Sequence, residues 1–173
     1  MKDQKLIILF EQNNIDKNID ILLKPRENIT YNVYIIANNQ NKKININVKH
    51  QAYSQATINV NSICLKQGHI DIKINNSVKA NMTNCVIRQN ITGLILDDDS
   101  YIEAFPTMQV ENSLIDAQHS VNIGNINQEQ LYYLMSRKLS KQQAVILLIK
   151  NMFNLVEEKQ YQFILDNLEE KQL

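Results

Sequence analysis

Apolar and polar residues alternate along most of this chain, and no other feature constrains its fold as strongly. In "KKININVK" (residues 42–49) the isoleucines and the valine fall on one side and the asparagines on the other. "ATINVNSICL" (56–65) and "HIDIKIN" (69–75) repeat the pattern. Side chains on a strand point alternately to its two faces, so one set enters a core while the other meets solvent. No helical pattern of ten or more residues interrupts residues 29–124, which we predict to be all β.

Turn-forming residues are scarce, and this bears on the choice of architecture. Short strands at this spacing are compatible with a sandwich, a barrel or a β-solenoid. The chain has three glycines and two prolines, and it lacks the Asn-Gly and Asp-Gly steps that tight hairpins favour. Asparagine tolerates the left-handed backbone of turns, and asparagine-rich strands suit stacked rungs because like residues lie above one another. The pattern favours the solenoid and leaves the other two architectures open.

The apolar spacing becomes helical after Gly124. Asn127 is placed to cap a first helix, and Ser140 with Gln143 forms a capping box for a second one. The expected apolar faces are Leu131, Leu134 and Met135 in the first helix, then Ala144, Leu147, Leu148, Met152 and Leu155, and finally Phe163, Ile164 and Leu168. We therefore predict a β core over residues 1–124 and a subdomain of two or three helices over residues 125–173.

The charge balance argues against a general electrostatic role. Lys+Arg and Asp+Glu number 18 each, so the formal net charge is zero, and we expect neither a nucleic-acid nor a membrane partner. The longest apolar run, residues 144–149, is far too short to span a bilayer. "LIILF" (6–10) is too short for a secretory signal core. We expect a cytoplasmic protein.

Motifs of catalysis and nucleotide binding are missing from the sequence, so we do not expect an enzyme. GxGxxG, GxxxxGK[ST], HExxH and GxSxG do not occur. The "DDD" at residues 97–99 ends one strand before the next begins, which indicates a solvated turn. Cys64 and Cys85 form no CxxC pair and no disulfide framework, so we expect two reduced, buried thiols.

The three histidines differ mainly in their neighbourhood. His50 and His69 fall at strand edges among polar residues, where surface or ladder positions are expected. His119 follows an extended segment and lies shortly before the first helix. A single histidine without a second ligand makes no metal site. The residues alone therefore favour a packed, structural side chain for His119 over a ligand or an interface residue.

Residues 117–153, "AQHSVNIGNINQEQLYYLMSRKLSKQQAVILLIKNMF", resemble the C-terminal signature of the SufB/SufD family of iron–sulfur cluster assembly proteins. That signature contains a histidine, "AT.G.I", an acidic or Gln pair, "LFYL" or "YYL", "SRG" and "S..EA..L....F". The matching positions are His119, Gly124, Ile126, Glu129, Gln130, Leu131, Tyr132, Tyr133, Leu134, Ser136, Arg137, Ser140, Ala144 and Phe153. A weaker similarity covers residues 80–112, where Pro106 fits a proline of the family.

Three departures from the family pattern make the chain resemble SufD more than SufB. Full-length members are longer and carry an N-terminal helical region, so this chain is expected to be a minimal core. Lys138 stands where the family has the glycine of "SRG". SufB-type chains carry a cysteine in the strand before the histidine and a glutamate directly after it, whereas this chain has "NITGLIL" (90–96) and Ser120.

The resemblance implies a fold, a function and partners. The fold is a right-handed parallel β-helix with a small C-terminal helical subdomain. The function is that of a non-catalytic scaffold subunit, which binds a SufC-type ATPase through Gln130, Leu131, Tyr133, Leu134 and Arg137. The end of the β-helix, with His119, is expected to meet a second SufB/SufD-type subunit. There His119 is an interface residue and a candidate ligand of iron or of a transient iron–sulfur cluster.

Two other interpretations stay open. A degenerate homologue would keep the fold as a homodimeric interaction module with no iron role, and the missing cysteine favours this version. A β-helix acting on polysaccharide would line one face of its rungs with carboxylates and aromatic rings. Few rung positions in this chain carry either kind of side chain.

Overall fold

The computed structural model of the chain describes residues 2–10 and 13–153. The chain divides into two compact units, residues 1–124 and residues 125–173. The first unit consists of strands, and the described part of the second unit consists of two helices.

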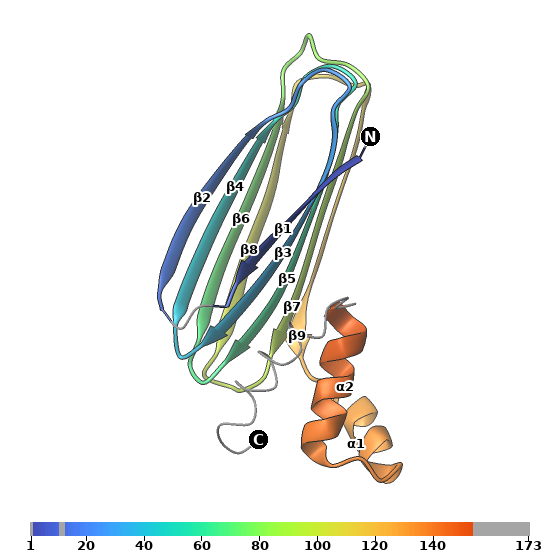
Figure 1. Cartoon of the computed structure of the whole chain (residues 1–173). Coiled ribbons are helices and arrows are strands. Elements are labelled where there is room, and N and C mark those ends of the chain that lie inside the picture. The colour runs from blue at the N-terminus through green and yellow to red at the C-terminus, as the bar shows by residue number, and fades with distance from the viewer. Residues whose placement is uncertain (1, 11–12, 154–173) are drawn as a thin grey trace. The chain divides into compact units, whose positions relative to one another are not determined.

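Nine strands form the described part of the first unit. They are β1 (Lys2–Leu9), β2 (Ile15–Leu22), β3 (Asn28–Asn38), β4 (Asn41–Lys49), β5 (Gln55–Leu65), β6 (His69–Val78), β7 (Cys85–Ile95), β8 (Tyr101–Val110) and β9 (Ile115–Asn125). One sheet has the order β1-β3-β5-β7-β9 and the other β2-β4-β6-β8 (Figure 1). Because consecutive strands alternate between the sheets, each strand pairs in parallel with the strand two places along. This arrangement, a β-solenoid of about four turns, confirms the predicted parallel β-helix.

The predicted alternation is what fills the solenoid. Ile44 pairs in register with Ile72, and Ile46 pairs with Ile74, so identical side chains stack along the inside of the second sheet. All four are completely buried. Fully burying an isoleucine stabilises a fold by about 1.5–3 kcal/mol. The monotonous isoleucine content of the strands is therefore the main source of the solenoid's core.

Asparagines form hydrogen-bonded rows on the outside of both sheets. In the first sheet, Asn59 Nδ2 donates to Asn32 Oδ1 at 2.8 Å, and Asn90 Nδ2 donates to Asn59 Oδ1 at 2.9 Å. Ser120 Oγ lies 3.0 Å from Asn90 Oδ1 and extends the row to β9. A second row runs through Asp20, Asn47, Asn75 and Thr107. Each side chain lies above its equivalent in the previous rung, as expected for asparagine-rich stacked strands.

The corners of the solenoid use left-handed backbone without glycine. Arg26, Tyr53 and Asn84 have positive φ angles and occupy one corner of successive rungs. Their amides donate to the next rung, to the oxygens of Ala52 (3.0 Å), Thr83 (2.9 Å) and Leu114 (2.9 Å). The opposite corner has positive φ at Asn39, Lys66 and Gln67. Asparagine thus fills only two of these positions. Other residue types are tolerated because hydrogen bonds between rungs hold the left-handed backbone in place.

Gly68 and Asp97 lie at this opposite corner and shape it in different ways. A Cβ atom on Gly68 would lie 2.5 Å from the carbonyl oxygen of Ala37, so only glycine fits against the rung below. Asp97 accepts hydrogen bonds from the amides of Lys66 (2.5 Å) and Asp99 (3.2 Å). Asp98 and Asp99 are exposed. The "DDD" segment is therefore the turn that the sequence predicted.

The two predicted helices are present as α1 (Gln128–Ser136) and α2 (Lys141–Phe153), and their caps are confirmed. Asn127 Oδ1 accepts a hydrogen bond from the amide of Gln130 at 3.1 Å. At the start of α2 the amide of Ser140 donates to Gln143 Oε1 (2.9 Å), and the amide of Gln143 donates to Ser140 Oγ (3.1 Å). This reciprocal pair is the capping box.

The buried face of α2 differs from the predicted one at Leu147, which is 44% exposed. Ala144, Val145 and Ile149 are the buried residues. At about 100° per residue, Leu147 points away from Val145, so both cannot face inward. The predicted apolar positions Leu155, Phe163, Ile164 and Leu168 lie outside the described residues. Among the helices of the described segments, none is long and apolar enough to cross a membrane.

Candidate functional site

Strand β9 lies at the edge of the first sheet, and β8 lies at the same end of the second. We call these two strands and their inward-facing side chains the open end. In the described part of the chain no further strand pairs with either of them. An unpaired edge presents a row of free backbone donors and acceptors, which is a template for pairing with another strand.

The two faces of β9 can be assigned from its neighbours. Ile115 and Ile123 pack against the apolar interior. Asp116 and Ser120 instead face outward, since Asp116 pairs with Arg88 at 2.5 Å and Ser120 joins the asparagine row. The Arg88 guanidinium, by hydrogen bonding, holds the pKa of Asp116 below its ordinary value. Because side chains alternate, His119 belongs to the inward row with Ile115 and Ile123. It is nevertheless exposed, since no described strand covers it.

The open end and the segment that enters it expose several apolar side chains. Val121, in the same row of β9, is 44% exposed, and Val110 at the end of β8 is 38% exposed. Leu114, in the segment that enters β9, is 61% exposed. The open end therefore combines exposed aliphatic side chains, unpaired strand edges and one imidazole. These are features of a surface that another chain covers.

Among the described residues, His119 is not part of a cluster of metal-binding side chains. Across residues 2–10 and 13–153, no group of three or more His, Cys, Asp or Glu side chains is placed to hold a metal ion. Cys64 is buried, and burial raises the pKa of its thiol to about 12, so it stays protonated at neutral pH. Within the part of the chain that the structure describes, the open end offers one imidazole as a potential iron ligand, and one side chain alone does not make a metal site.

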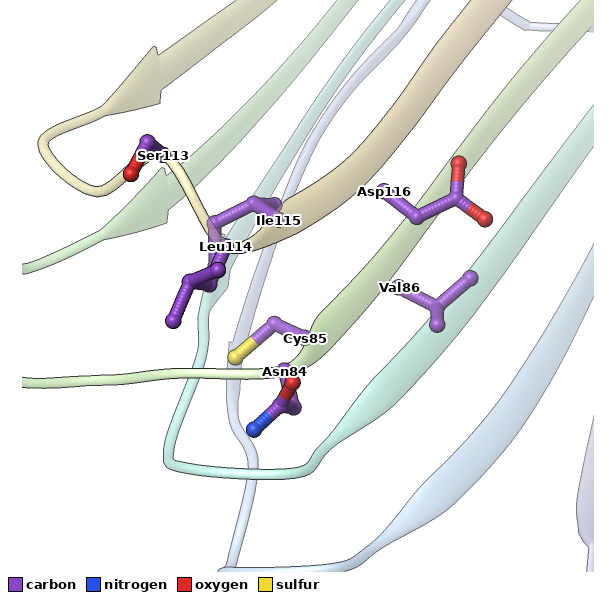
Figure 2. A pocket seen from close by; sticks show the side chains of 7 residues that line it. All are labelled: Asn84, Cys85, Val86, Ser113, Leu114, Ile115 and Asp116. Carbon is purple, nitrogen blue, oxygen red and sulfur yellow. The ribbon is translucent and has the colours of Figure 1, made fainter.

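Cys85 lies beside a surface pocket at the last corner of the solenoid. Figure 2 shows the pocket, of about 410 Å³, between Asn84, Cys85 and Val86 on one side and Leu114 and Ile115 on the other. The thiol is 1% exposed and donates to the oxygen of Gln51 at 3.2 Å. Both cysteines are thus free and buried, as predicted.

Of the two positions predicted for His50, surface or ladder, the surface position is wrong, and the ring instead contacts a residue of the neighbouring rung. It is 3% exposed, with Nδ1 2.9 Å from Ser54 Oγ and Nε2 3.0 Å from Asn76 Oδ1. Burial lowers the pKa of this imidazole below its ordinary value of 6.5, and the bond to Asn76 partly opposes the shift. The alternation pattern ends before His50, so it could not show that the corner turns this side chain inward.

His69 does occupy the predicted ladder position. It is the register partner of Tyr101, and the two rings stack with centroids 3.7 Å apart. Its Nε2 lies 3.9 Å from a carboxylate oxygen of Glu103. The contacts of His69 are therefore to the neighbouring rung.

In the helical unit, the residues predicted to bind an ATPase have unequal exposure. Gln130 and Arg137 are exposed, and Tyr133 is 58% exposed. The Arg137 guanidinium lies 5.3 Å from the Tyr133 ring centroid and donates to its hydroxyl at 3.3 Å. Leu134 is half-buried, whereas Leu131 is 4% exposed and is therefore not available at the surface.

Gln89 is a residue that the sequence interpretation missed. It lies on β7 in the inward row with Cys85, Ile87 and Ile91, and it is completely buried. Its Nε2 donates to the oxygens of Thr107 (3.0 Å) and Ile74 (3.5 Å). The signal in the sequence was a polar residue at a position where the alternation in "CVIRQNI" calls for an apolar one.

Comparisons with known proteins agree on one family. The model of the SufBD core domain of the SUF system for iron–sulfur cluster assembly matches residues 12–152. An iron–sulfur cluster assembly SufBD family protein of Galdieria sulphuraria is 28% identical over 120 residues, which cover 68% of this chain and 52% of the relative. SufBD family proteins of Staphylococcus aureus strains USA300 and NCTC 8325 are 36% identical over 56 residues, covering 32% of this chain and 12% of each relative. The matched part of this chain thus spans about half or less of these relatives.

Proposed function

This chain belongs to the SufB/SufD family of iron–sulfur cluster assembly proteins, and from this premise we propose that it acts as a SufD-like scaffold subunit. The observation that carries the proposal is the position of His119 on β9. The imidazole faces inward at an end of the solenoid where no further described strand pairs with β8 or β9. A scaffold subunit needs this combination of a potential ligand and a surface for the partner that supplies the remaining ligands.

The proposed first partner is a second SufB/SufD-type subunit at the open end. The edges of β8 and β9 offer backbone hydrogen bonds, and Val110 and Val121 offer apolar area. His119 would be covered in such a pair. It would then be a candidate ligand for iron or for a transient cluster, which is cargo of the complex and not a resident cofactor of this chain. Histidine replaces cysteine on iron in some clusters.

The proposed second partner is a SufC-type ATPase bound by the helical unit. The sequence has no phosphate-binding loop of its own, so ATP-driven work requires another protein. Tyr133 and Arg137 form an exposed aromatic–cation pair on α1, and both residue types are frequent at the centres of interfaces. Gln130 and Leu134 would border the contact, and buried Leu131 would hold the helix in place. In this proposal the chain has a non-catalytic role. Its location is cytoplasmic, as expected from the sequence.

The ATPase contact is tested by co-purification with a SufC-type ATPase from the same organism. We expect Tyr133→Ala and Arg137→Ala to weaken binding by about tenfold or more, as for other central aromatic and arginine contacts. Tyr132→Ala is the matched control, since Tyr132 is 66% exposed but points about 100° away on the helix. Equal recovery of the ATPase with the Tyr133→Ala protein would reject the helical unit as its binding site.

A homodimeric module without an iron role is the second candidate, favoured because no group of three or more metal-binding side chains is found among the described residues. Anaerobic reconstitution with iron and sulfide separates the two candidates, in the presence and absence of the partner proteins. The scaffold proposal expects a charge-transfer absorption that is lost in His119→Ala. A Val121→Lys change should abolish the subunit contact under either candidate, so it identifies the interface but not the iron role. If no absorption depends on His119 in any mixture, the homodimeric module is the better description.

A further inference from the structure

The side-chain amide of Gln89 has a fixed orientation. Its nitrogen lies against two backbone carbonyl oxygens of the opposite sheet, those of Thr107 and Ile74. A carbonyl oxygen accepts hydrogen bonds only, so the NH₂ group must occupy that side of the amide. The other end of the amide is therefore Oε1, an acceptor.

This oxygen is buried and has no hydrogen-bond partner in the structure. Nearly all buried polar atoms in proteins have a partner, so an unpartnered one in a completely buried side chain calls for an explanation. The residue below Gln89 in the same row is Ile58, which has no polar side-chain atom. Within this row, a donor can therefore come only from the rung above.

The rung above Gln89 is β9, and its register places His119 next in the row. Ser120 is bonded to Asn90 on the outward face. On the inward face, a Cβ atom built on Gly93 would lie 3.0 Å from Ile123 Cγ1. The sequence separation between Asn90 and Ser120 equals that between Gly93 and Ile123. The same separation places His119 beside Gln89. Within the row, His119 is the neighbour that carries N–H donors.

We propose that Gln89 is a positioning residue for His119. Its carboxamide oxygen accepts a hydrogen bond from one imidazole N–H, which holds the neutral ring in a single tautomer. The lone pair of the other ring nitrogen is then directed to the open end, where a metal ion or a donor of the partner subunit can use it. This inference deepens the proposed function, on which the use of that lone pair rests, and it assigns a role to a buried polar group inside the core.

The test is nitrogen NMR of the histidine side chains in the full chain, at a pH where imidazole is neutral. The shifts of the two ring nitrogens report the ratio of the tautomers directly. We expect the wild-type His119 ring to be held in one tautomer. In Gln89→Met, whose side chain has a similar length but no acceptor oxygen, the ratio should move by at least about threefold toward that of a free imidazole.

Gln118→Met is the matched control, because Gln118 neighbours His119 on β9 but lies on the outward face and is exposed. It should leave the His119 signals unchanged. If Gln89→Met does not fold, the wild-type spectrum decides alone, since a His119 ring averaged between tautomers overturns the proposal. A ratio that is the same in wild type and in Gln89→Met overturns it as well.

The outcome is independent of the scaffold proposal. A His119 tautomer that depends on Gln89, in a protein that gives no cluster absorption with any partner, would keep this inference and reject the iron role. A His119 ring averaged between tautomers, in a protein that still gives a His119-dependent absorption, would reject this inference and keep the iron role.

Discussion

A single buried imidazole, His50, ties the stability of the solenoid to pH. Its ring nitrogens are engaged by Ser54 and Asn76 inside a corner, where a charged ring has little access to water. Burial lowers its pKa in the folded protein, so the unfolded chain binds a proton at a higher pH than the folded one. Stability from this group is complete above about pH 6.5, its ordinary value, and declines as the pH falls from there toward the folded pKa.

We therefore expect the denaturation midpoint of the wild-type protein to fall between pH 7.5 and pH 5.5, measured by urea titration at fixed ionic strength. In His50→Gln, which cannot take up a proton, this part of the pH dependence should be lost. An unchanged slope in His50→Gln would show that the sensitivity resides elsewhere.

Gly68 is a position where one added methyl group is expected to lower the stability of the protein. An added methyl group would lie 2.5 Å from the oxygen of Ala37, a backbone atom that cannot rotate away. We expect Gly68→Ala to lower the free energy of unfolding by about 2–3 kcal/mol through overpacking. Gly124→Ala is the control, because nothing lies within 4 Å of a Cβ atom at Gly124. Similar unfolding midpoints for the two variants would contradict the close contact.

Among the elements, the outward row Asn32, Asn59, Asn90 and Ser120 joins four strands of the first sheet. Asn59 is bonded on both sides, to Asn32 and to Asn90. Each such bond is worth about 0.5–1.5 kcal/mol net, so Asn59→Ala should destabilise the protein by about 1–2 kcal/mol.

The matched control for this row is Asn61→Ala, on the same face of the same strand. Its register neighbours are Tyr34 and Thr92, so it is not part of the amide row. Equal losses in thermal or urea denaturation for Asn59→Ala and Asn61→Ala would show that the amide row adds nothing beyond ordinary strand packing.

Strands and helix caps were predictable from the sequence because their determinants are local. Alternation fixed which side of β4 and β6 is buried, and Ser140 with Gln143 fixed where α2 begins. Corners were not predictable in this way. The left-handed backbone at Tyr53 and Lys66 depends on hydrogen bonds to the next rung, which a one-dimensional pattern does not contain.

The candidate site was predictable only in part for the same reason. His119 was identified by its spacing to the tyrosine helix, but its inward direction became clear from its neighbours on β7. Gln89 went unnoticed because its meaning depends on the carbonyl groups of the opposite sheet. Leu147 was assigned to the wrong face of α2 because the apolar stripe there is broad and the sequence shows no single boundary.

For the whole molecule, the division into two compact units suggests that the solenoid folds by itself. We expect residues 1–124 produced alone to keep the β-type circular dichroism spectrum and a cooperative unfolding transition, because the strands pair with one another and enclose their own core. The same fragment should no longer retain the ATPase. A fragment that is unfolded when soluble would reject residues 1–124 as an independent domain.

Because its rungs stack along one axis, the solenoid is expected to open from its ends. A coil in such a protein is supported by the coils directly above and below it, so folding free energy adds up along one dimension and terminal coils open most easily. β9 has a neighbouring strand on one side only and most of its residues are exposed. Amide hydrogens should therefore exchange faster in β9 than in β5, and a subunit that pairs with β9 turns a fraying terminal coil into an internal one. Binding of a partner subunit at the open end and the folding of β9 are therefore thermodynamically coupled.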